Sequence, residues 1–307
     1  MTMADFRRKN NEYRIRPGAS RRSIRVLFCV FLSLFVLSLL VGCGKEFPPT
    51  RRDGEVAVHF IDVGQGDAIL IEDGKKTVLI DTGNAETAHT DALLSYLRAR
   101  KITKIDYLIL THPDEDHIGG AVRVLETFPV SVCLLPDAVN DTPTFLNTLD
   151  ALDAASVYAA EAKAEDVYPL EKSVLTVLSP TGEADSLNEM SVVLRLTVGT
   201  RHFLFTADAG EKTERILLAT YPESKLSADV IKVSHHGAAG AGCDEFLDAV
   251  SPTYGVISCG KNNSYGHPAG EVLYRYGEHG IRLYRTDESG SVVFLTDGED
   301  LRVSTEH

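Results

Sequence analysis

Four side chains that commonly bind metal ions stand within six residues of one another, at His112, Asp114, Asp116 and His117. An apolar run at 105–110 leads directly into them. Two imidazoles and two carboxylates placed so closely are costly to bury alone, whereas divalent cations satisfy them. A pair of metal ions is the natural occupant, and such a pair makes water nucleophilic near neutral pH. The segment therefore predicts a hydrolytic site with two metals.

More imidazoles and carboxylates follow other predicted strands in the same manner. His235 and His236 come after an apolar run at 230–233, Asp208 follows a run at 201–206, and Asp81 follows a run at 77–80. In αβ sheets the junctions between strands and loops gather at one edge, where binding sites form. We therefore expect these side chains to lie beside the 112–117 segment.

The elements that must position these residues alternate between strands and helices. Strands are predicted at 56–63, 68–72, 77–80, 105–110, 131–135, 174–178, 191–198, 201–206, 230–233, 254–258, 282–285 and 291–295. Helices are predicted at 90–100, 121–126, 212–220, 243–250 and 271–276, with an acidic helix or two between 135 and 174. The mixture, which contains no repeat, fits one αβ domain of about 250 residues.

Seven motifs in order give the chain a family resemblance. They lie at 62–67, 79–83, 111–120, 191–195, 208, 234–237 and 262–268. In this order they resemble the metallo-β-lactamase superfamily, and in particular the hydrolase domain of the ComEC competence proteins. The resemblance covers about residues 55–298, and it implies an α/β fold built as a four-layered αββα sandwich with two metals at one edge.

The resemblance also assigns ligands position by position. It places Asp116 and His117 on one metal, His112 on the other, and Asp208 as the carboxylate between them. One of His235 and His236 completes the Asp116 side. We favour His236, because the family's ligand usually follows one residue after the strand exit.

The chain departs from the family pattern on the His112 side. Asp114 stands where most relatives have a histidine, although the ComEC group shares the aspartate. Where most relatives carry a further histidine, this chain has Asn188, Glu189 and Ser191, of which Asn188 and Ser191 are expected beside the ligands. This half is poorer in nitrogen and richer in oxygen than a two-zinc site, so Mn²⁺ or Mg²⁺ is more plausible there than in a β-lactamase. The expected cofactors are two divalent ions, zinc or manganese.

Three residues are expected to support the chemistry. Asp116 could also orient the attacking water, Asp81 would fix a ligand imidazole, and His267 could touch a phosphate or protonate a leaving oxygen. Two of them have a plainer reading: Asp81 as a loop cap and His267 as an ordered loop residue. Asp62 and Asp67 flank glycines and are read as turn residues.

The first 42 residues differ from the rest of the chain. A basic head spans 7–25, an apolar run spans 26–41, and Leu40-Val41-Gly42-Cys43 resembles a lipobox. This predicts a signal peptide at 1–42, a lipid on Cys43, a tether at 43–54 and the hydrolase domain at 55–307. The alternative is an uncleaved N-terminal membrane anchor. Both place the domain outside the cytoplasmic membrane and attached to it, and no protein partner is predicted.

Charge restricts the choice of substrate. Residues 1–42 hold eight of the 31 Lys and Arg and two of the 44 Asp and Glu, which leaves a body with a net charge of −19. So acidic a body argues against tight non-specific binding of nucleic acid. A small-molecule or nucleic-acid phosphodiester, DNA included, is the leading substrate class, implied by the resemblance. The alternatives are a lactone, a β-lactam or a choline phosphoester, or a surface binding protein with a degenerate metal site.

Overall fold

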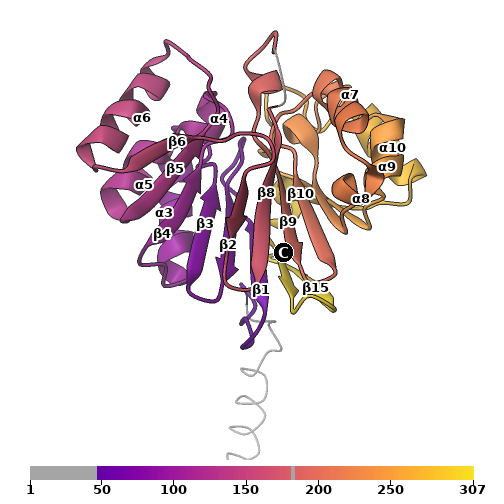
Figure 1. Cartoon of the computed structure of the whole chain (residues 1–307), viewed down its shortest axis with the longest axis horizontal. Coiled ribbons are helices and arrows are strands. Elements are labelled where there is room, and N and C mark those ends of the chain that lie inside the picture. The colour runs from indigo at the N-terminus through magenta and orange to yellow at the C-terminus, as the bar shows by residue number, and fades with distance from the viewer. Residues whose placement is uncertain (1–46, 181–183) are drawn as a thin grey trace, which may run out of the picture. The chain divides into compact units, whose positions relative to one another are not determined.

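Two β-sheets stack face to face and carry helices on their outer faces (Figure 1). The structure, a computed structural model, describes residues 47–180 and 184–307. The predicted signal peptide, Cys43 and the start of the tether lie outside the described residues. Within the described part, no helix is both long and apolar enough to cross a membrane.

The first sheet has the order β15-β14-β1-β2-β3-β4-β5-β6. Its strands are β1 Val56–Phe60, β2 Ile69–Asp73, β3 Lys76–Ile80, β4 Ile105–Ile109, β5 Val130–Leu135, β6 Tyr158–Glu161, β14 Val292–Thr296 and β15 Leu301–Thr305. From β3 to β6 the strands run parallel, and the other neighbours are antiparallel. The predicted hairpin of 68–72 and 77–80 is confirmed, with Asp73 opposite Lys76 across a tight turn.

The second sheet has the order β13-β12-β11-β10-β9-β8-β7. Its strands are β7 Val167–Pro169, β8 Ser173–Ser179, β9 Val193–Val198, β10 Arg201–Phe205, β11 Val230–Lys232, β12 Tyr254–Ile257 and β13 Arg282–Arg285. From β10 to β13 the strands run parallel. Each sheet thus has a parallel part whose strand ends face the same edge, the arrangement that collects functional loops.

Helices cover the outer faces of both sheets (Figure 1). Those beside the first sheet are α3 Thr87–Ala99, α4 Glu115–Ile118, α5 Ala121–Thr127 and α6 Pro143–Ala154. Those beside the second are α7 Glu211–Thr220, α8 Glu223–Leu226, α9 Asp244–Val250 and α10 Gly270–Glu278, and the short α11 Thr286–Ser289 follows β13. Leu93 and Leu97 of α3 pack on the first sheet, while Leu217 of α7 and Phe246 of α9 pack on the second. The predicted four-layered αββα sandwich is confirmed.

The core between the sheets is built from alternate strand residues. Val58 and Phe60 of β1 face this core, and Phe60 meets Phe294 edge to face at a ring distance of 6.0 Å. Phe203 and Phe205 of β10 close the core from the second sheet. Full burial of such a side chain contributes roughly 1.5–3 kcal/mol, so this layer holds the two sheets, and the loops at their ends, in fixed register.

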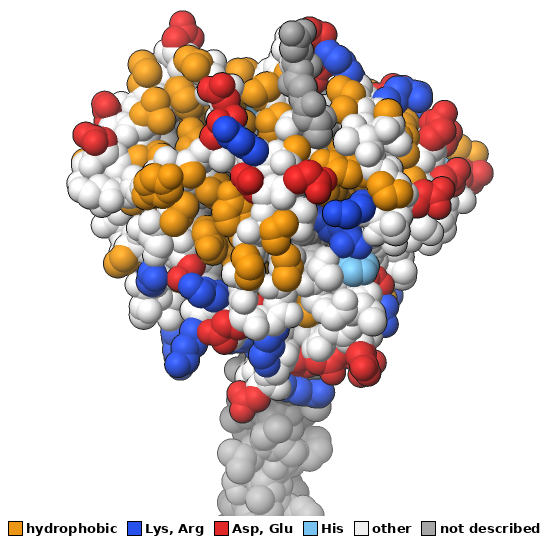
Figure 2. Space-filling view, in the orientation of Figure 1, with side chains coloured by type: hydrophobic (Ala, Val, Ile, Leu, Met, Phe, Trp, Pro, Cys, Tyr) orange, Lys and Arg blue, Asp and Glu red, His pale blue; other side chains and the backbone are white. Residues whose placement is uncertain are grey.

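The stretch between 135 and 174 is where the sequence-based prediction was least complete. It contains the expected helix, α6, and also two short strands, β6 and β7, that were not predicted. Both are edge strands. Figure 2 shows hydrophobic side chains gathered on the face where β6, β7 and β8 lie, and the exposed Tyr158, Val167 and Val174 belong to these strands. An edge strand of three or four residues, largely exposed, carries too little alternation to be read from sequence.

Candidate metal centre

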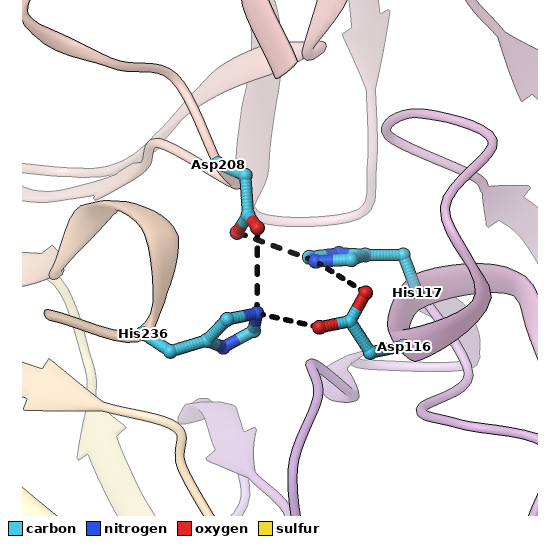
Figure 3. A group of neighbouring side chains, drawn as sticks. All are labelled: Asp116, His117, Asp208 and His236. Atoms are coloured by element: carbon cyan, nitrogen blue, oxygen red, sulfur yellow. Dashed lines mark ion pairs between the residues drawn. The ribbon is translucent and has the colours of Figure 1, made fainter. Parts of the chain in front are cut away.

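Loops that leave β4, β10 and β11 bring four candidate ligands to one point (Figure 3). Asp116 and His117 lie in α4 after β4, Asp208 follows β10, and His236 follows β11. One ligand atom from each of the four lies within 4.8 Å of the others. This placement agrees with the expectation that the residues after these strands would lie beside the 112–117 segment.

Distances within this group suit a shared cation. Nε2 of His117 lies 3.2 Å from Oδ1 of Asp208 and 3.9 Å from Oδ1 of Asp116. Nε2 of His236 lies 3.2 Å from Oδ2 of Asp116 and 3.4 Å from Oδ2 of Asp208. Each imidazole nitrogen therefore faces both carboxylates, and a single ion placed among them would touch all four residues (Figure 3).

A second, looser group shares the Oδ2 atom of Asp208 with His236. This atom lies 3.6 Å from Nε2 of His235 and 4.0 Å from Nε2 of His112. Nε2 of His112 lies 3.7 Å from Oδ2 of Asp114. The structure thus places His236 beside both Asp116 and Asp208, whereas His235 faces Asp208 and has a side chain that is 37% exposed. Asp208 stands between two groups that differ in tightness.

Unusual backbone geometry aims the side chains at the centre. Asp81 has a φ of 58°, Ala207 a φ of 48°, His235 a φ of 48° and His236 a φ of 54°. This left-handed region costs residues with a side chain roughly 1–2 kcal/mol each. Residues in this conformation cluster at the ends of β3, β10 and β11, and backbone strain of this kind is typical of functional sites.

Two glycines seat α4 against the loop that follows β3. A Cβ atom on Gly119 would lie 2.2 Å from the backbone nitrogen of Ala85, and one on Gly120 would lie 2.4 Å from the carbonyl oxygen of Thr82. The loops are also bonded directly, since the Thr82 backbone nitrogen donates to the carbonyl of His117 at 2.7 Å. Any side chain at either glycine would push His117 away from its partners.

A hydrogen-bond relay fixes which nitrogen of two imidazoles faces the centre. Nδ1 of His117 lies 2.8 Å from Oδ2 of Asp81, a carboxylate that can only accept. The Thr111 hydroxyl gives its one hydrogen to the same Asp81 oxygen at 2.7 Å. Its oxygen is then left to accept from Nδ1 of His112 at 3.1 Å. In their neutral forms both rings therefore present an unprotonated Nε2 to the centre, as metal-binding histidines do.

Several ligand atoms of the site are buried without a hydrogen-bond partner, as expected where a cation binds. Nδ1 of His236 donates to the carbonyl of Ser258 at 2.8 Å, so the neutral ring likewise presents an unprotonated Nε2. Among the described residues, Nε2 of His112, His117 and His236 and Oδ1 of Asp208 are buried with no hydrogen-bond partner. Buried polar atoms are seldom left unpaired. Three nitrogen lone pairs and a carboxylate that converge in this way fit divalent metal ions.

Electrostatics agree with that assignment. Burial alone would lower the pKa of His117, but the charges of Asp208 and Asp81 raise it well above its ordinary value. Burial also opposes the rise in the pKa of His236, which Asp208 and Asp116 bring about. These carboxylates favour a positive charge between them, and a divalent cation supplies it while leaving the nitrogen lone pairs free to coordinate.

A buried ion pair lies beside the centre. Lys232, the last residue of β11, places Nζ 2.6 Å from Oδ2 of Asp67 and 3.5 Å from Oδ1 of Asp208. Oδ1 of Asp67 in turn lies 3.4 Å from Nδ1 of His236. The reading of Asp67 as a turn residue was therefore wrong, because its carboxylate is buried in the site.

Sequence reasoning missed Lys232 and Thr111 altogether. Lys232 interrupts an apolar strand, and a charge in so short a buried run was the signal that could have found it. Thr111 stood inside a quoted motif but received no role. Both act through long-range contacts, with Asp67 and Asp81 respectively.

The other predicted residues lie at varying distances from the metal groups. Nδ2 of Asn188 lies 3.5 Å from Nε2 of His235. The His267 ring lies 5.6 Å from the His235 ring and 6.2 Å from the His236 ring, centroid to centroid. Ser191 is fully buried, and its hydroxyl has no hydrogen-bond partner among the described residues. Asn188 and His267 are thus neighbours of candidate ligands.

An open, polar cavity of about 1020 Å³ reaches the centre at Asp116. Its wall includes Glu115 of α4, Gln65, and the loop 260–265. The side chain of Asp116 is 29% exposed, so a molecule in the cavity can reach this carboxylate. The arrangement can hold a cation among Asp116, His117, Asp208 and His236, expose it to a polar substrate and place a carboxylate beside an attacking water.

Comparison with known proteins agrees with the motifs. Residues 61–261 match the Metallo-beta-lactamase superfamily. The chain is 33% identical over 265 residues to ComE operon protein 3 of Bacillus subtilis strain 168, covering 81% of this chain and 34% of that protein. Its identity is 31% with Competence protein ComA of Neisseria gonorrhoeae (83% and 34% covered) and 29% with Recombination protein 2 of Haemophilus influenzae (90% and 33% covered). The chain spans about a third of the length of these relatives, and the predicted family resemblance is confirmed.

Solved structures show the same fold. The metallo-beta-lactamase fold protein YhfI from Bacillus subtilis matches with a TM-score of 0.50 and 12% identity, covering 81% of this chain and all of that one. A mutant of the CmlA beta-hydroxylase matches with a TM-score of 0.50 and 16% identity, covering 88% of this chain and 59% of that one. At such identities the likeness extends to the fold alone.

Proposed function

This chain belongs to the Metallo-beta-lactamase superfamily, and from that premise we propose that it is a metal-dependent phosphodiesterase that acts on nucleic acid. The observation that carries the proposal is the convergence of unpaired imidazole nitrogens and carboxylates at one point, which an open polar cavity reaches at Asp116. Two relatives are named as a competence protein and a recombination protein, names that support nucleic acid as the substrate class. A polar cavity next to bound cations would also suit an anionic diester better than an apolar lactone.

The candidate ligands are proposed to bind two cations, one in each group. Asp116, His117 and His236 would hold one cation, and Asp208 would share it with a second cation held by His112, Asp114 and His235. When bound, such cations would lower the pKa of a water toward neutrality and stabilise charge on phosphoryl oxygens. Zinc or manganese is proposed, with the oxygen-rich His112 side favouring the harder ion.

Proton handling is proposed for two residues, Asp116 on the cavity wall and His267 beside the ring of His236. The partly exposed carboxylate of Asp116 can accept a hydrogen bond from the attacking water and so orient it. His267, whose ring stacks beside that of His236, can contact a phosphate oxygen or protonate the leaving oxygen. Asp81 and Thr111 hold the imidazoles that these groups depend on.

Activity profiling of the purified full-length chain tests the proposal. Bis-p-nitrophenyl phosphate, single-stranded DNA, a lactone and nitrocefin are compared with added Mn²⁺ or Zn²⁺. We expect cleavage of the two phosphodiesters, and loss of that cleavage in Asp116→Asn, which keeps the shape of the side chain. Turnover of the lactone or nitrocefin alone would contradict the proposed substrate class.

We also propose that the domain is held at the cell envelope through its N-terminus, by a lipid on Cys43 or by an uncleaved helix. The competence relatives support an envelope role. Metabolic labelling with palmitate distinguishes the two forms of attachment: a lipoprotein incorporates label that Cys43→Ser abolishes. An unlabelled chain that stays in the membrane fraction would identify the uncleaved anchor instead.

A further inference from the structure

The loop 260–267, which follows β12, forms a wall of the cavity that opens at the metal centre. Lys261, Asn263 and Tyr265 of this loop line the same cavity as Asp116. Tyr265 is 69% exposed, which is unusual for a large aromatic side chain. An exposed aromatic ring on the wall of this cavity is available to contact a bound ligand.

Three rings form a series from the surface to a candidate metal ligand. The Tyr265 ring is stacked with that of His267 at a centroid distance of 5.7 Å and an interplanar angle of 22°. The His267 ring is stacked with that of His236 at 6.2 Å and 26°. The Tyr265 ring is thus held nearly parallel to the rings behind it, and its exposed surface can accept one more planar group.

One side chain holds the loop in this shape. Nδ2 of Asn263 donates to the carbonyls of Gly260 at 2.9 Å and of His267 at 2.5 Å. Its Oδ1 accepts from the backbone nitrogens of Tyr265 at 3.1 Å and of His267 at 3.0 Å. Both aromatic residues are therefore pre-organised, which reduces the entropy lost when a ligand binds.

Charge on the cavity wall limits what the ligand can be. Within the described part of the chain, no carboxylate lies within 4 Å of Nζ of Lys261, whereas Arg285 is paired with Asp287 and Glu288. The wall otherwise carries acidic side chains, at Asp62, Glu86, Glu115, Asp287 and Glu288. An acidic wall with one unpaired cation suits contact with a single phosphate near Lys261 and not with a long stretch of the phosphate backbone.

We propose that the loop 260–267 is a nucleotide-binding subsite, an inference that rests on the proposed phosphodiesterase function. Tyr265 stacks on an unpaired base next to the scissile phosphate, and Lys261 contacts a neighbouring phosphate. A base inside a duplex has both faces covered by its neighbours and would have to be unstacked first. The subsite therefore selects single strands and frayed ends over intact duplex.

Binding to an oligonucleotide tests the subsite without relying on turnover. The probe is a single-stranded phosphorothioate oligonucleotide that contains 2-aminopurine, whose fluorescence falls when the base stacks. We expect quenching with the full-length wild-type chain and with Tyr265→Phe, and an affinity about 5- to 100-fold weaker with Tyr265→Ala. Tyr274→Ala serves as the matched control, because Tyr274 of α10 is 70% exposed and lies outside the cavity wall.

Two outcomes would overturn the subsite: equal binding by Tyr265→Ala and the wild type, or equal binding of single strand and intact duplex. Cleavage of methyl p-nitrophenyl phosphate, which has no base, is measured alongside. If this diester and DNA both resist cleavage while Tyr265→Ala still loses binding, the phosphodiesterase proposal fails and the subsite stands. If both are cleaved and Tyr265→Ala binds normally, the subsite alone fails.

Discussion

The Nζ atom of Lys232 lies 2.6 Å from Oδ2 of Asp67, and both side chains are shut away from solvent. The pair holds charges of opposite sign beside a centre that is itself rich in carboxylates. Burial alone would lower the pKa of Lys232, but the charges of Asp67 and Asp208 raise it, so the lysine stays charged. Lys232 therefore places one fixed positive charge beside Asp67 and Asp208, and no added metal has to provide that charge.

Replacing this lysine should destabilise the fold. Lys232→Met leaves the Asp67 carboxylate buried without its partner, which costs about 3–5 kcal/mol in the free energy of unfolding. Urea unfolding followed by circular dichroism, with a chelator present, measures the loss. The double variant Lys232→Met/Asp67→Asn should recover part of it, since the uncompensated charge is gone. Losses that simply add in the double variant would refute the pairing.

The contact between Asp81 and His117 should govern metal affinity more than folding. Asp81→Asn removes the carboxylate that accepts from Nδ1 of His117 and lets the imidazole adopt the wrong tautomer. We expect metal to bind about 10- to 100-fold more weakly, as measured by competition with a chromophoric chelator. Thr111→Val should act in the same direction through His112. Unchanged affinity in both variants would show that the relay has no part in binding.

Replacing His235 and replacing His236 should have different effects on the amount of metal that the protein binds. His236 is buried and faces both Asp116 and Asp208, whereas His235 is partly exposed and faces Asp208 from the looser side. His236→Ala should lose the tighter metal, and His235→Ala should lose only the weaker one. Metal content after dialysis, measured by mass spectrometry, separates the two. Loss of the tighter metal in His235→Ala, with its retention in His236→Ala, would contradict these assignments.

Local patterns predicted most strands and helices and most of the candidate ligands, because these depend on short-range features, whereas the layered fold was implied by the family resemblance. The turn after Asp73 and the polar residues at the end of β4 are visible within a few residues of sequence. Asp67 and Lys232 were misread or missed because each acquires its role from the other, 165 positions away. β7 was missed because only its pairing with β8 makes it a strand.

The free energy of unfolding should decrease at acid pH because of Glu72, a buried residue of β2. Burial would raise the pKa of Glu72, but contact with His59 and the charge of Arg100 lower it to about 2. Its stabilising effect is therefore complete above its unfolded value of about 4.5 and is lost as the pH falls toward 2. Glu72→Gln should cost up to about 3 kcal/mol at pH 6, with the difference from wild type narrowing below pH 4.5. Chelator-treated samples are compared by urea unfolding, and a difference that stays constant with pH would contradict the assignment.

Adding a nitrogen to the looser group should change which metal it prefers. The oxygen donor Asp114 lies 3.7 Å from Nε2 of His112, on the side that also lacks the further histidine of most relatives. Asp114→His replaces a hard oxygen ligand with an imidazole, which favours Zn²⁺ over Mn²⁺. Calorimetric titration with each ion should show tighter zinc binding and weaker manganese binding at one of the two sites, with the other unchanged. Asp114→Asn, which removes the charge without adding a nitrogen, is the control and should weaken both ions at that site. An identical zinc-to-manganese ratio in Asp114→His and the wild type would mean that Asp114 does not reach the metal.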